Sequence, residues 1–385
     1  MLNVAIVGTG NISPMHINGF LAHPDKAKIV ALCDIIPAKA EAKKAEFGLT
    51  DAAVYDSVDG ILARDDIDLV SVATPPSTHA ELTIALLKSG KNVLVEKPMA
   101  PSVADCDAMI QAAKESGKML SVISQNRWRD DVAGLKAVID SGLLGPIASL
   151  QVDSAWWRGL PYYDLWWRGT WESEGGGPTL NHAIHHLDLV AWLMGGTPSK
   201  VTSVMTNAWH DNSEVEDLAV AVLTYPRALA TVTASVVHHG EKQRFIIQGR
   251  DAAVEIPWAV TSEVTQPNGF PYNESDAARE QQIADLHASL PPLPFTAHAG
   301  QIGDVLDALD AGREPAVTGA DGKRIIEIVQ AIYRAAIEER TVSLPMAEGD
   351  DWYTGDALLA QAPRFFTKTS SVADQEGDIR TQRTA

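Results

Sequence analysis

Short apolar runs and amphipathic stretches alternate through the first third of the chain. The short runs indicate buried strands, and stretches with apolar residues every three or four positions indicate helices. The predicted strands span residues 4–7, 29–33, 69–73, 93–95 and 120–123, with a weaker strand near Val54. The predicted helices between them include residues 38–47, 78–89 and 102–116. This alternation predicts βαβ units and a parallel, doubly wound sheet.

The pattern changes in the second part of the chain, where strands follow one another with little helix between them. Such a pattern, which begins at residues 147–157, indicates a mostly antiparallel sheet, with strands at residues 201–207, 218–225, 228–237, 244–248 and 252–256. We therefore predict an α/β protein. A Rossmann domain is expected at residues 1–124, and a second α/β domain, built on an open, mostly antiparallel sheet, at 125–345. The extension at 346–385 has a polar end, which is expected to fray from Phe366 onward.

A stretch with three histidines lies near the centre of the chain. Pro178 suits a first helical position and Gly195 suits a left-handed stop, so residues 178–194 are predicted to form one helix. An imidazole one turn from an amide oxygen can be held in one tautomer, as a general base requires. The alternative is that these histidines only pack or lie at the surface. One face of this helix would carry Asn181, His185, Asp188 and Trp192.

The composition is that of a soluble globular protein, with 45% apolar and 21% charged residues. The net charge of −19 argues against a nucleic-acid or anionic-membrane partner. Two cysteines, Cys33 and Cys106, cannot form a disulfide framework, which fits a reducing compartment. No signal peptide is expected before the first strand, and no apolar run reaches the roughly 18 residues of a membrane span. We predict a cytoplasmic protein.

The first predicted strand leads into a glycine-rich turn typical of dinucleotide-binding folds. Gly8 permits the tight turn, and Gly10 lets backbone amides approach a pyrophosphate at the start of the next helix. Ser13 replaces the third glycine of the usual fingerprint, so a plain strand–helix turn is the alternative. Asp34, at the end of the second strand, can accept both ribose hydroxyls of NAD and would repel the 2′-phosphate of NADP.

Other polar residues follow the later strands, at the edge where ligands bind in open α/β sheets. Lys97 follows the fifth strand, and its ammonium could bond a cofactor ribose and a substrate oxygen together. The alternative is a simple exposed lysine. A loop at residues 156–171 holds five of the ten tryptophans, which could stack on a sugar, fill the space under the sheet, or contact another subunit. Further candidates at the strand ends are Thr74, Pro75, His79, Glu96 and Asn126.

The ordered set of these motifs resembles the glucose–fructose oxidoreductase / inositol dehydrogenase (Gfo/Idh/MocA) family over roughly residues 1–345. The matching segments are Gly8-Thr9-Gly10-Asn11-Ile12, Ala73-Thr74-Pro75-Pro76, Glu96-Lys97-Pro98, and Gly175-Gly176-Gly177 leading to Asn181-His182-Ala183-Ile184-His185. The resemblance implies a Rossmann domain with an α/β domain, NAD dependence, and oxidation or reduction of a sugar or cyclitol hydroxyl.

By position, the resemblance makes Lys97 and His185 catalytic, with Asn181 as the neutral partner of the histidine where many members have aspartate. It places the cofactor near Gly8, Gly10, Asn11, Ile12, Asp34, Thr74, Pro75, His79, Glu96, Lys97, Asn126, Trp167 and Arg168. It places the substrate near Lys97, Tyr163, Arg168, Asn181, His182 and His185.

The expected activity is an NAD-dependent dehydrogenase acting on a sugar, glycoside or inositol, with His185 as general base. The alternatives are a glycosidase that oxidises its substrate transiently with NAD, and an NAD-sensing regulator, which would need neither Lys97 nor His185. No metal is expected, because no carboxylate or cysteine completes the histidine cluster.

The strands predicted at 218–225 and 228–237 carry apolar residues on both faces, which favours a homodimer or homotetramer formed through the sheet domain. Residues 257–297 read as an insertion, either a lid or a subunit contact.

Overall fold

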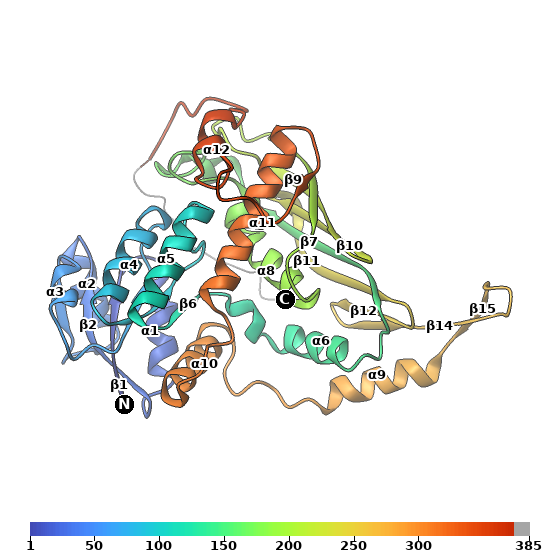
Figure 1. Cartoon of the computed structure of the whole chain (residues 1–385), viewed down its shortest axis with the longest axis horizontal. Coiled ribbons are helices and arrows are strands. Elements are labelled where there is room, and N and C mark those ends of the chain that lie inside the picture. Colours follow the sequence, from blue (N-terminus) through green and yellow to red (C-terminus); the bar gives the residue numbers. More distant parts are fainter. Residues whose placement is uncertain (373–385) are drawn as a thin grey trace.

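The computed structural model describes residues 1–372, which form two lobes side by side (Figure 1). The first lobe contains a six-stranded sheet of order β3-β2-β1-β4-β5-β6 with every pair parallel, as predicted. Its strands are β1 Leu2–Val7, β2 Ala27–Cys33, β3 Ala53–Tyr55, β4 Leu69–Val72, β5 Asn92–Val95 and β6 Leu120–Val122. Its helices are α1 Ser13–Leu21, α2 Pro37–Glu46, α3 Asp59–Leu62, α4 His79–Lys88 and α5 Val103–Ser116. The strand order reverses between β1 and β4, so a ligand is expected beyond the carboxyl ends of these strands.

The second lobe is built on an eight-stranded sheet of order β13-β12-β11-β7-β10-β9-β8-β16. Its pairs are antiparallel except for β7 and β10, which run parallel. The prediction of a mostly antiparallel sheet is therefore confirmed. The strands are β7 Ile147–Trp157, β8 Lys200–Thr206, β9 Leu218–Tyr225, β10 Ala228–Ser235, β11 Val237–Gly249, β12 Ala253–Ile256, β13 Ala259–Thr261 and β16 Val342–Ser343.

Helices of the second half of the chain join the two lobes. α11 (Gly319–Ile337) packs on β8 and also on α5 and β6 of the first lobe, where a Cβ on Gly322 would lie 2.6 Å from Val122. α10 (Ala297–Ala311) packs on α1 so closely that a Cβ on Gly19 would lie 2.3 Å from Ile302. The first lobe is thus completed by residues far along the chain. Other helical segments of the chain are α6 Asp130–Asp140 and the short 3-10 segments η1 Pro76–Thr78, η2 Gln125–Trp128 and η3 Leu160–Asp164.

The stretch predicted as one helix is two helices, α7 (Pro178–Asn181) and α8 (Ile184–Leu193). The amides of His182 and Ala183 both donate to the carbonyl of Pro178, at 3.0 and 2.8 Å. This double use of one carbonyl interrupts the regular ladder of hydrogen bonds and lets the chain start a second helix. The prediction of a single stripe through residues 181 and 185 was therefore wrong.

The end of the chain is also more ordered than predicted. After α12 (Asp356–Gln361), the segment 363–372, called here the C-terminal strap, crosses the loop that follows β7. The amide of Trp166 donates to Val372 at 3.0 Å, and the amide of Val372 donates to Asp164 at 2.7 Å. The polar composition suggested fraying because it lacks an apolar period, but backbone hydrogen bonds hold this segment. The rest of the predicted frayed tail lies outside the described residues.

The insertion at 257–297 projects from the second lobe (Figure 1). It contains a hairpin of β14 (Glu263–Thr265) and β15 (Pro271–Ser275), followed by α9 (Ala277–Ser289). Every residue of this hairpin's strands is exposed. Within the described part of the chain, no helix has the length and apolar character that crossing a membrane would require.

Candidate active site

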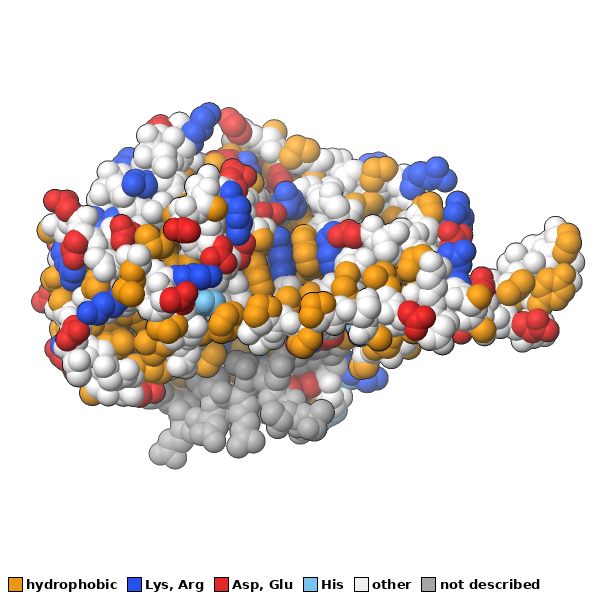
Figure 2. Space-filling model, turned by 90° about the horizontal axis from the view of Figure 1, so that it is seen from below, with side chains coloured by type: hydrophobic (Ala, Val, Ile, Leu, Met, Phe, Trp, Pro, Cys, Tyr) orange, Lys and Arg blue, Asp and Glu red, His pale blue; other side chains and the backbone are white. Residues whose placement is uncertain are grey.

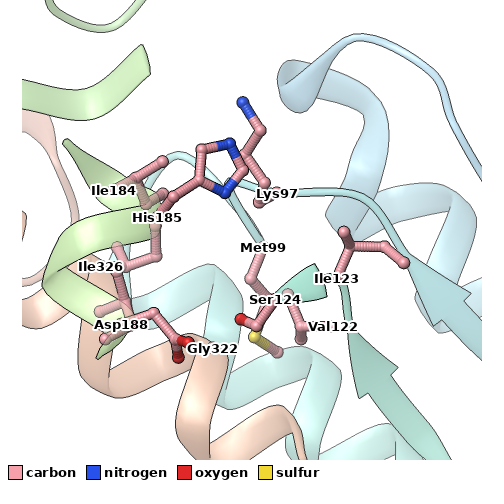
Figure 3. Close-up of a pocket in the computed structure, with 11 residues that line it drawn as sticks. Lys97, Met99, Val122, Ile123, Ser124, Ile184, His185, Asp188, Gly322 and Ile326 are labelled. Carbon is pink, nitrogen blue, oxygen red and sulfur yellow. The ribbon is translucent and has the colours of Figure 1, made fainter. Parts of the chain in front are cut away.

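Lys97 and His185 line one cavity between the lobes (Figure 3). Lys97 follows β5, and His185 lies on the first turn of α8. Figure 3 shows their polar groups on the same side of the cavity, while its other walls come from β6 and α11. The cavity has a volume of about 20 Å³, so it forms the narrow base of a site rather than the whole of it. Two side chains predicted from separate motifs are thus brought together.

Lys97 presents a half-buried ammonium to this cavity. Its Nζ donates to the backbone carbonyl of Asn181 at 3.5 Å, and its backbone amide donates to Glu96 at 2.9 Å. Burial lowers the pKa of Lys97, the charge of Glu96 opposes this, and Arg168 lowers it further. An ammonium with one long hydrogen bond has donors left for a substrate oxygen.

His185 is neutral in this setting. Burial lowers its pKa well below the ordinary value of 6.5, and the positive charge of Lys97 adds to the effect. A neutral imidazole beside an ammonium can accept a proton while the ammonium stabilises the oxygen that loses it.

Asn181 does not act in the way predicted for it. Its side-chain amide donates to Glu174 at 3.0 Å and to the carbonyl of Gly176 at 2.8 Å, toward the glycine turn. The break between α7 and α8 removes the one-turn spacing that would have aimed the amide at His185. Asn181 reaches the site through its backbone carbonyl, which accepts from Lys97.

The glycine turn before α7 is held by Glu216, a residue that no local motif indicated. A Cβ on Gly177 would lie 1.9 Å from the Glu216 carbonyl, so only glycine fits. The buried carboxylate of Glu216 accepts from the amides of Gly177 and Thr179 at 3.0 and 3.1 Å and from the Tyr333 hydroxyl at 3.1 Å. Burial raises the pKa of Glu216 to about 7. Only the three-dimensional structure reveals this role of Glu216, because the residue lies far along the chain from the turn.

A second buried carboxylate, Glu174, ties the aromatic loop to this region. It accepts from Arg168 at 2.7 Å and from the amide of Gly169 at 2.6 Å. The Arg168 guanidinium lies over the rings of Tyr162 and Trp167, 4.2 and 4.1 Å from their centroids. Arg168 is therefore fixed in position, with its planar face covered by aromatic rings.

Tyr163 was predicted to contact substrate, but its side chain is 1% exposed and packs against His210. The neighbouring Tyr162 has its ring centroid 6.0 Å from that of His182. Tyr163 is therefore part of the core, and the alternation of aromatic residues did not reveal its burial.

The three histidines of the central stretch lie in different places. The His182 ring packs beside Trp156 with centroids 5.5 Å apart, and burial together with Arg158 lowers its pKa well below 6.5. His186 is fully buried next to Phe245, and burial lowers its pKa to about 4. His186 is therefore part of the core. Asp188 lines the same cavity as His185, as their shared helix face predicted, and its carboxylate accepts from Arg127 at 2.6 and 2.9 Å.

The nucleotide end of the site agrees with the predicted turn. Gly8 has φ +92, and a Cβ there would lie 2.5 Å from the Ala73 carbonyl, whereas a Cβ on Gly10 would meet only open space. Ser13 is buried and donates to the Gly10 carbonyl at 2.8 Å, so it fills the place of the third glycine without opening the turn. The open side of Gly10 fits a pyrophosphate approaching the backbone.

Asp34 holds its carboxylate beside this turn. One oxygen accepts from the Thr9 amide and hydroxyl, both at 2.8 Å, and the other from the Ile36 amide at 2.9 Å. Burial alone would raise the pKa of Asp34, but the hydrogen bonds from Ile36 and Thr9 outweigh it and lower the pKa. The group is an ionised, fixed acceptor with lone pairs to spare.

Two residues predicted to bind the cofactor have structural roles instead. His79 is fully buried, and its ring nitrogens bond the carbonyls of Pro98 and Thr74, both at 2.9 Å. Glu96 is 4% exposed and is directed into the lobe, where His16 lies 2.9 Å away. Strand-end position suggested both, but position alone does not tell which way a side chain points. The other predicted contacts at this end of the site are Asn11, Ile12, Thr74, Pro75 and Asn126, and none of them is buried.

Within the described residues, one ring nitrogen each of His16 and His298 and one carboxylate oxygen of Glu96 all lie within 4.8 Å of one another. This group does not include the three histidines of the central stretch, His182, His185 and His186.

A doubly wound sheet that offers a bare glycine turn and a fixed carboxylate, with a lysine–histidine pair beyond its strand ends, defines a dinucleotide-dependent oxidoreductase. Residues 2–124 match the family model described as oxidoreductase family, NAD-binding Rossmann fold, and residues 132–255 match the GFO/IDH/MocA C-terminal domain. The chain belongs to the Gfo/Idh/MocA family of NAD-binding oxidoreductases, as the sequence motifs suggested.

Named relatives cover almost the whole chain. Inositol 2-dehydrogenase of Rhizobium meliloti is 25% identical over 346 residues, which are 88% of this chain and 98% of the relative. The 2,7-anhydro-N-acetylneuraminate hydratase of Mediterraneibacter gnavus is 26% identical over 374 residues, 90% of this chain and 97% of the relative. The crystal structure of the WlbA dehydrogenase from Bordetella pertussis, in complex with NADH and UDP-GlcNAcA, is 28% identical with a TM-score of 0.75, covering 90% of this chain and 99% of that one.

Proposed function

We propose that this protein oxidises a secondary hydroxyl of a sugar, glycoside or inositol with NAD as hydride acceptor. The observation that carries the proposal is the placement of Lys97 and His185 on one cavity at the strand ends. The named inositol dehydrogenase among the relatives supports the substrate class.

The chain's own residues supply positioning and proton transfer. His185 takes the hydroxyl proton on a ring nitrogen, and the Lys97 ammonium stabilises the oxygen as its charge develops. NAD, when bound, would supply the hydride acceptor, so loss of the hydroxyl proton to His185 and of a hydride from the carbon that bears this hydroxyl would turn the alcohol into a carbonyl. The low pKa of His185 keeps the base ready at neutral pH.

The residues that would hold NAD lie along the switch point. The turn at Gly8 and Gly10 would receive the pyrophosphate, and Asp34 would accept the adenosine ribose hydroxyls. The fixed negative charge of Asp34 disfavours the extra phosphate of NADP. Trp167 and Arg168 remain proposed contacts on the opposite wall.

The substrate would lie between Lys97 and the wall formed by His182, Tyr162 and Arg168. Aromatic rings suit the C–H face of a sugar, and guanidinium and imidazole groups suit its hydroxyls. Arg168 is held in place for this task by Glu174.

The proposal is tested with a panel of inositols, aldoses and glycosides incubated with NAD. We expect NADH absorbance with at least one polyol that carries a free secondary hydroxyl. No NADH from any member of the panel, with protein that binds NAD by calorimetry, would contradict the proposal.

A second candidate follows from the relative named as a hydratase, since such a reaction leaves no net NADH. In that case the same two residues would oxidise the substrate transiently, and an elimination and reduction would follow. Chromatography of the reaction products would distinguish this candidate. A changed substrate, with tightly bound cofactor and no NADH released, would favour it, and the same result would fit an NAD-using glycosidase.

We further propose that the chain assembles through the outer face of its second sheet. Apolar side chains on that face are solvent-exposed in a single chain: Val204 is 68%, Val220 40% and Leu229 48% exposed. Burying them against a second copy would remove this apolar surface from water.

A further inference from the structure

Directly under the catalytic lysine lies a buried group of three titratable side chains. His16 comes from α1, Glu96 from the end of β5, and His298 from α10, and they are 0%, 4% and 8% exposed. The His16 ring bonds Ser71 at 2.7 Å through one nitrogen and Glu96 Oε1 at 2.9 Å through the other. His298 Nε2 lies 3.5 Å from the same carboxylate oxygen.

Within the described residues, the His298 side chain makes one polar contact, which is to Glu96. Among the described residues its buried Nε2 makes no hydrogen bond of ordinary length, and the Glu96 oxygen is the acidic atom before it. An unpartnered buried donor is costly, and so is a buried carboxylate without donors. The approach of His298 Nε2 to the Glu96 oxygen therefore suits both groups, while His16 makes the hydrogen bond of ordinary length to that oxygen.

The same carboxylate acts on Lys97. Its other oxygen accepts the Lys97 backbone amide at 2.9 Å, which fixes the main chain where the catalytic side chain begins. Its negative charge supports the ammonium against burial and against the positive charge of Arg168. Among the other titratable groups near by, His185 and His182 both have their pKa values lowered by Lys97.

We propose that His16, Glu96 and His298 form a positioning network that holds Lys97 in place and keeps it protonated for catalysis. His298 is its distinctive member, because it arrives from a helix 201 residues beyond Lys97 (298 − 97) that is docked on α1. The inference rests on the proposed dehydrogenase function, in which Lys97 acts as an ammonium.

The first test is the pH dependence of kcat/KM for four variants. Glu96→Gln removes the charge that supports the ammonium, so the alkaline limb should move to lower pH by about one to three units, the usual effect of a nearby opposite charge. His298→Ala should move the alkaline limb in the same direction, but by less. His298→Gln should return the alkaline limb to the unmutated position, since the glutamine amide can donate to the same Glu96 oxygen.

The matched control is His23→Ala. His23 lies at the same contact of α1 with α10 but bonds the Ala299 carbonyl, at 2.8 Å, and not Glu96. We expect its alkaline limb to stay at the unmutated position. An equal shift in His23→Ala and His298→Ala would contradict the proposal, because it would mean that loosening of the two helices alone moves Lys97. An upward shift in His298→Ala would contradict it too, since His298 would then act as a cation.

A second readout does not need catalysis. Competitive acetylation with acetic anhydride, followed by mass spectrometry of the Lys97 peptide, measures the pKa of that amine in each variant. We expect the amine to become reactive at lower pH in Glu96→Gln, with no change at the exposed Lys28. If the pKa of Lys97 is unchanged in an active Glu96→Gln enzyme, the proposed network is overturned but the proposed function is not. Inactivity of the unmutated protein on every substrate would instead overturn the proposed function. Stoichiometric zinc in purified protein would also contradict the proposal, because a metal ion would then neutralise Glu96.

Discussion

Asp34 sets the choice of cofactor in this account. Its carboxylate is held by Thr9 and Ile36 beside the glycine turn, and we expect its negative charge to repel the 2′-phosphate of NADP. We expect a clear preference for NAD in the unmutated protein, and a smaller preference in Asp34→Ala. The measurement is kcat/KM with each cofactor, with Asp56→Ala as a control near the same strand edge. Equal values for NAD and NADP in the unmutated protein would refute the assignment.

Glu216 gives the protein a dependence of stability on pH. Its folded-state pKa of about 7 lies above the ordinary 4.5, so the folded state holds the proton more tightly than the unfolded state. This contribution is present below pH 4.5 and is lost as pH rises through about 7. At about 1.4 kcal/mol per pKa unit its size is on the order of 3 kcal/mol.

The test is denaturant unfolding at several pH values. The free energy of unfolding of the unmutated protein should fall between about pH 4.5 and 7 more steeply than that of Glu216→Gln. Glu263→Gln, on the exposed hairpin, is the control and should keep the unmutated slope. The same slope in Glu216→Gln and the unmutated protein would show that Glu216 does not titrate in this range.

Residue conformations and positions were predictable where the backbone alone decides them. Gly8, Gly10 and Asp34 follow from the turn that a strand and a helix must make around a phosphate. Glu96 was assigned less well because a strand-end position does not say whether a side chain points outward or inward, and Tyr163 because the alternation of aromatic residues in its loop did not reveal its burial. Glu216 escaped notice because its partners are distant in sequence.

At the scale of elements, the sequence predicted most strands and helices within a few residues. It failed where one chain segment competes for hydrogen bonds with another. The carbonyl of Pro178 accepts two amides and so divides the central helix, and no apolar period reveals such a division. Backbone hydrogen bonds hold the C-terminal strap, and a polar composition without an apolar period does not reveal them.

We expect the C-terminal strap to support the aromatic loop at residues 156–171, which we propose to contact the substrate. The side chain of Asn212 accepts from the amides of Thr369 and Ser370, at 2.8 and 3.2 Å, and donates to Asp164 at 2.8 Å. Asn212→Ala removes these bonds and should loosen the aromatic loop. We expect KM for the substrate to rise by up to about tenfold, equivalent to 1.4 kcal/mol, with unchanged NAD affinity. Steady-state kinetics test this, and Asn268→Ala on the hairpin should behave as the unmutated protein. A weakened NAD affinity with unchanged KM would contradict it.

At the scale of the whole molecule, the proposed assembly is open to direct measurement. Figure 2 shows that the projecting end of the molecule also carries hydrophobic side chains, and the hairpin residues Phe270 and Tyr272 are 68% and 48% exposed. We expect light scattering at micromolar protein to give at least twice the mass of one chain. Val220→Glu, in the outer sheet face, should lower that mass, whereas Leu359→Glu, an exposed leucine on α12, should not. A monomeric unmutated protein would refute the assembly.

We propose that His185 is the general base and that the Lys97 ammonium is its partner. The most direct measurement is the rate of NADH formation in a single turnover by His185→Ala, with NAD affinity measured by calorimetry on the same protein. We predict a fall of about 10²–10⁴-fold, the usual range for removal of a general base, with nearly unchanged NAD affinity. Turnover of His185→Ala at the unmutated rate would contradict the account.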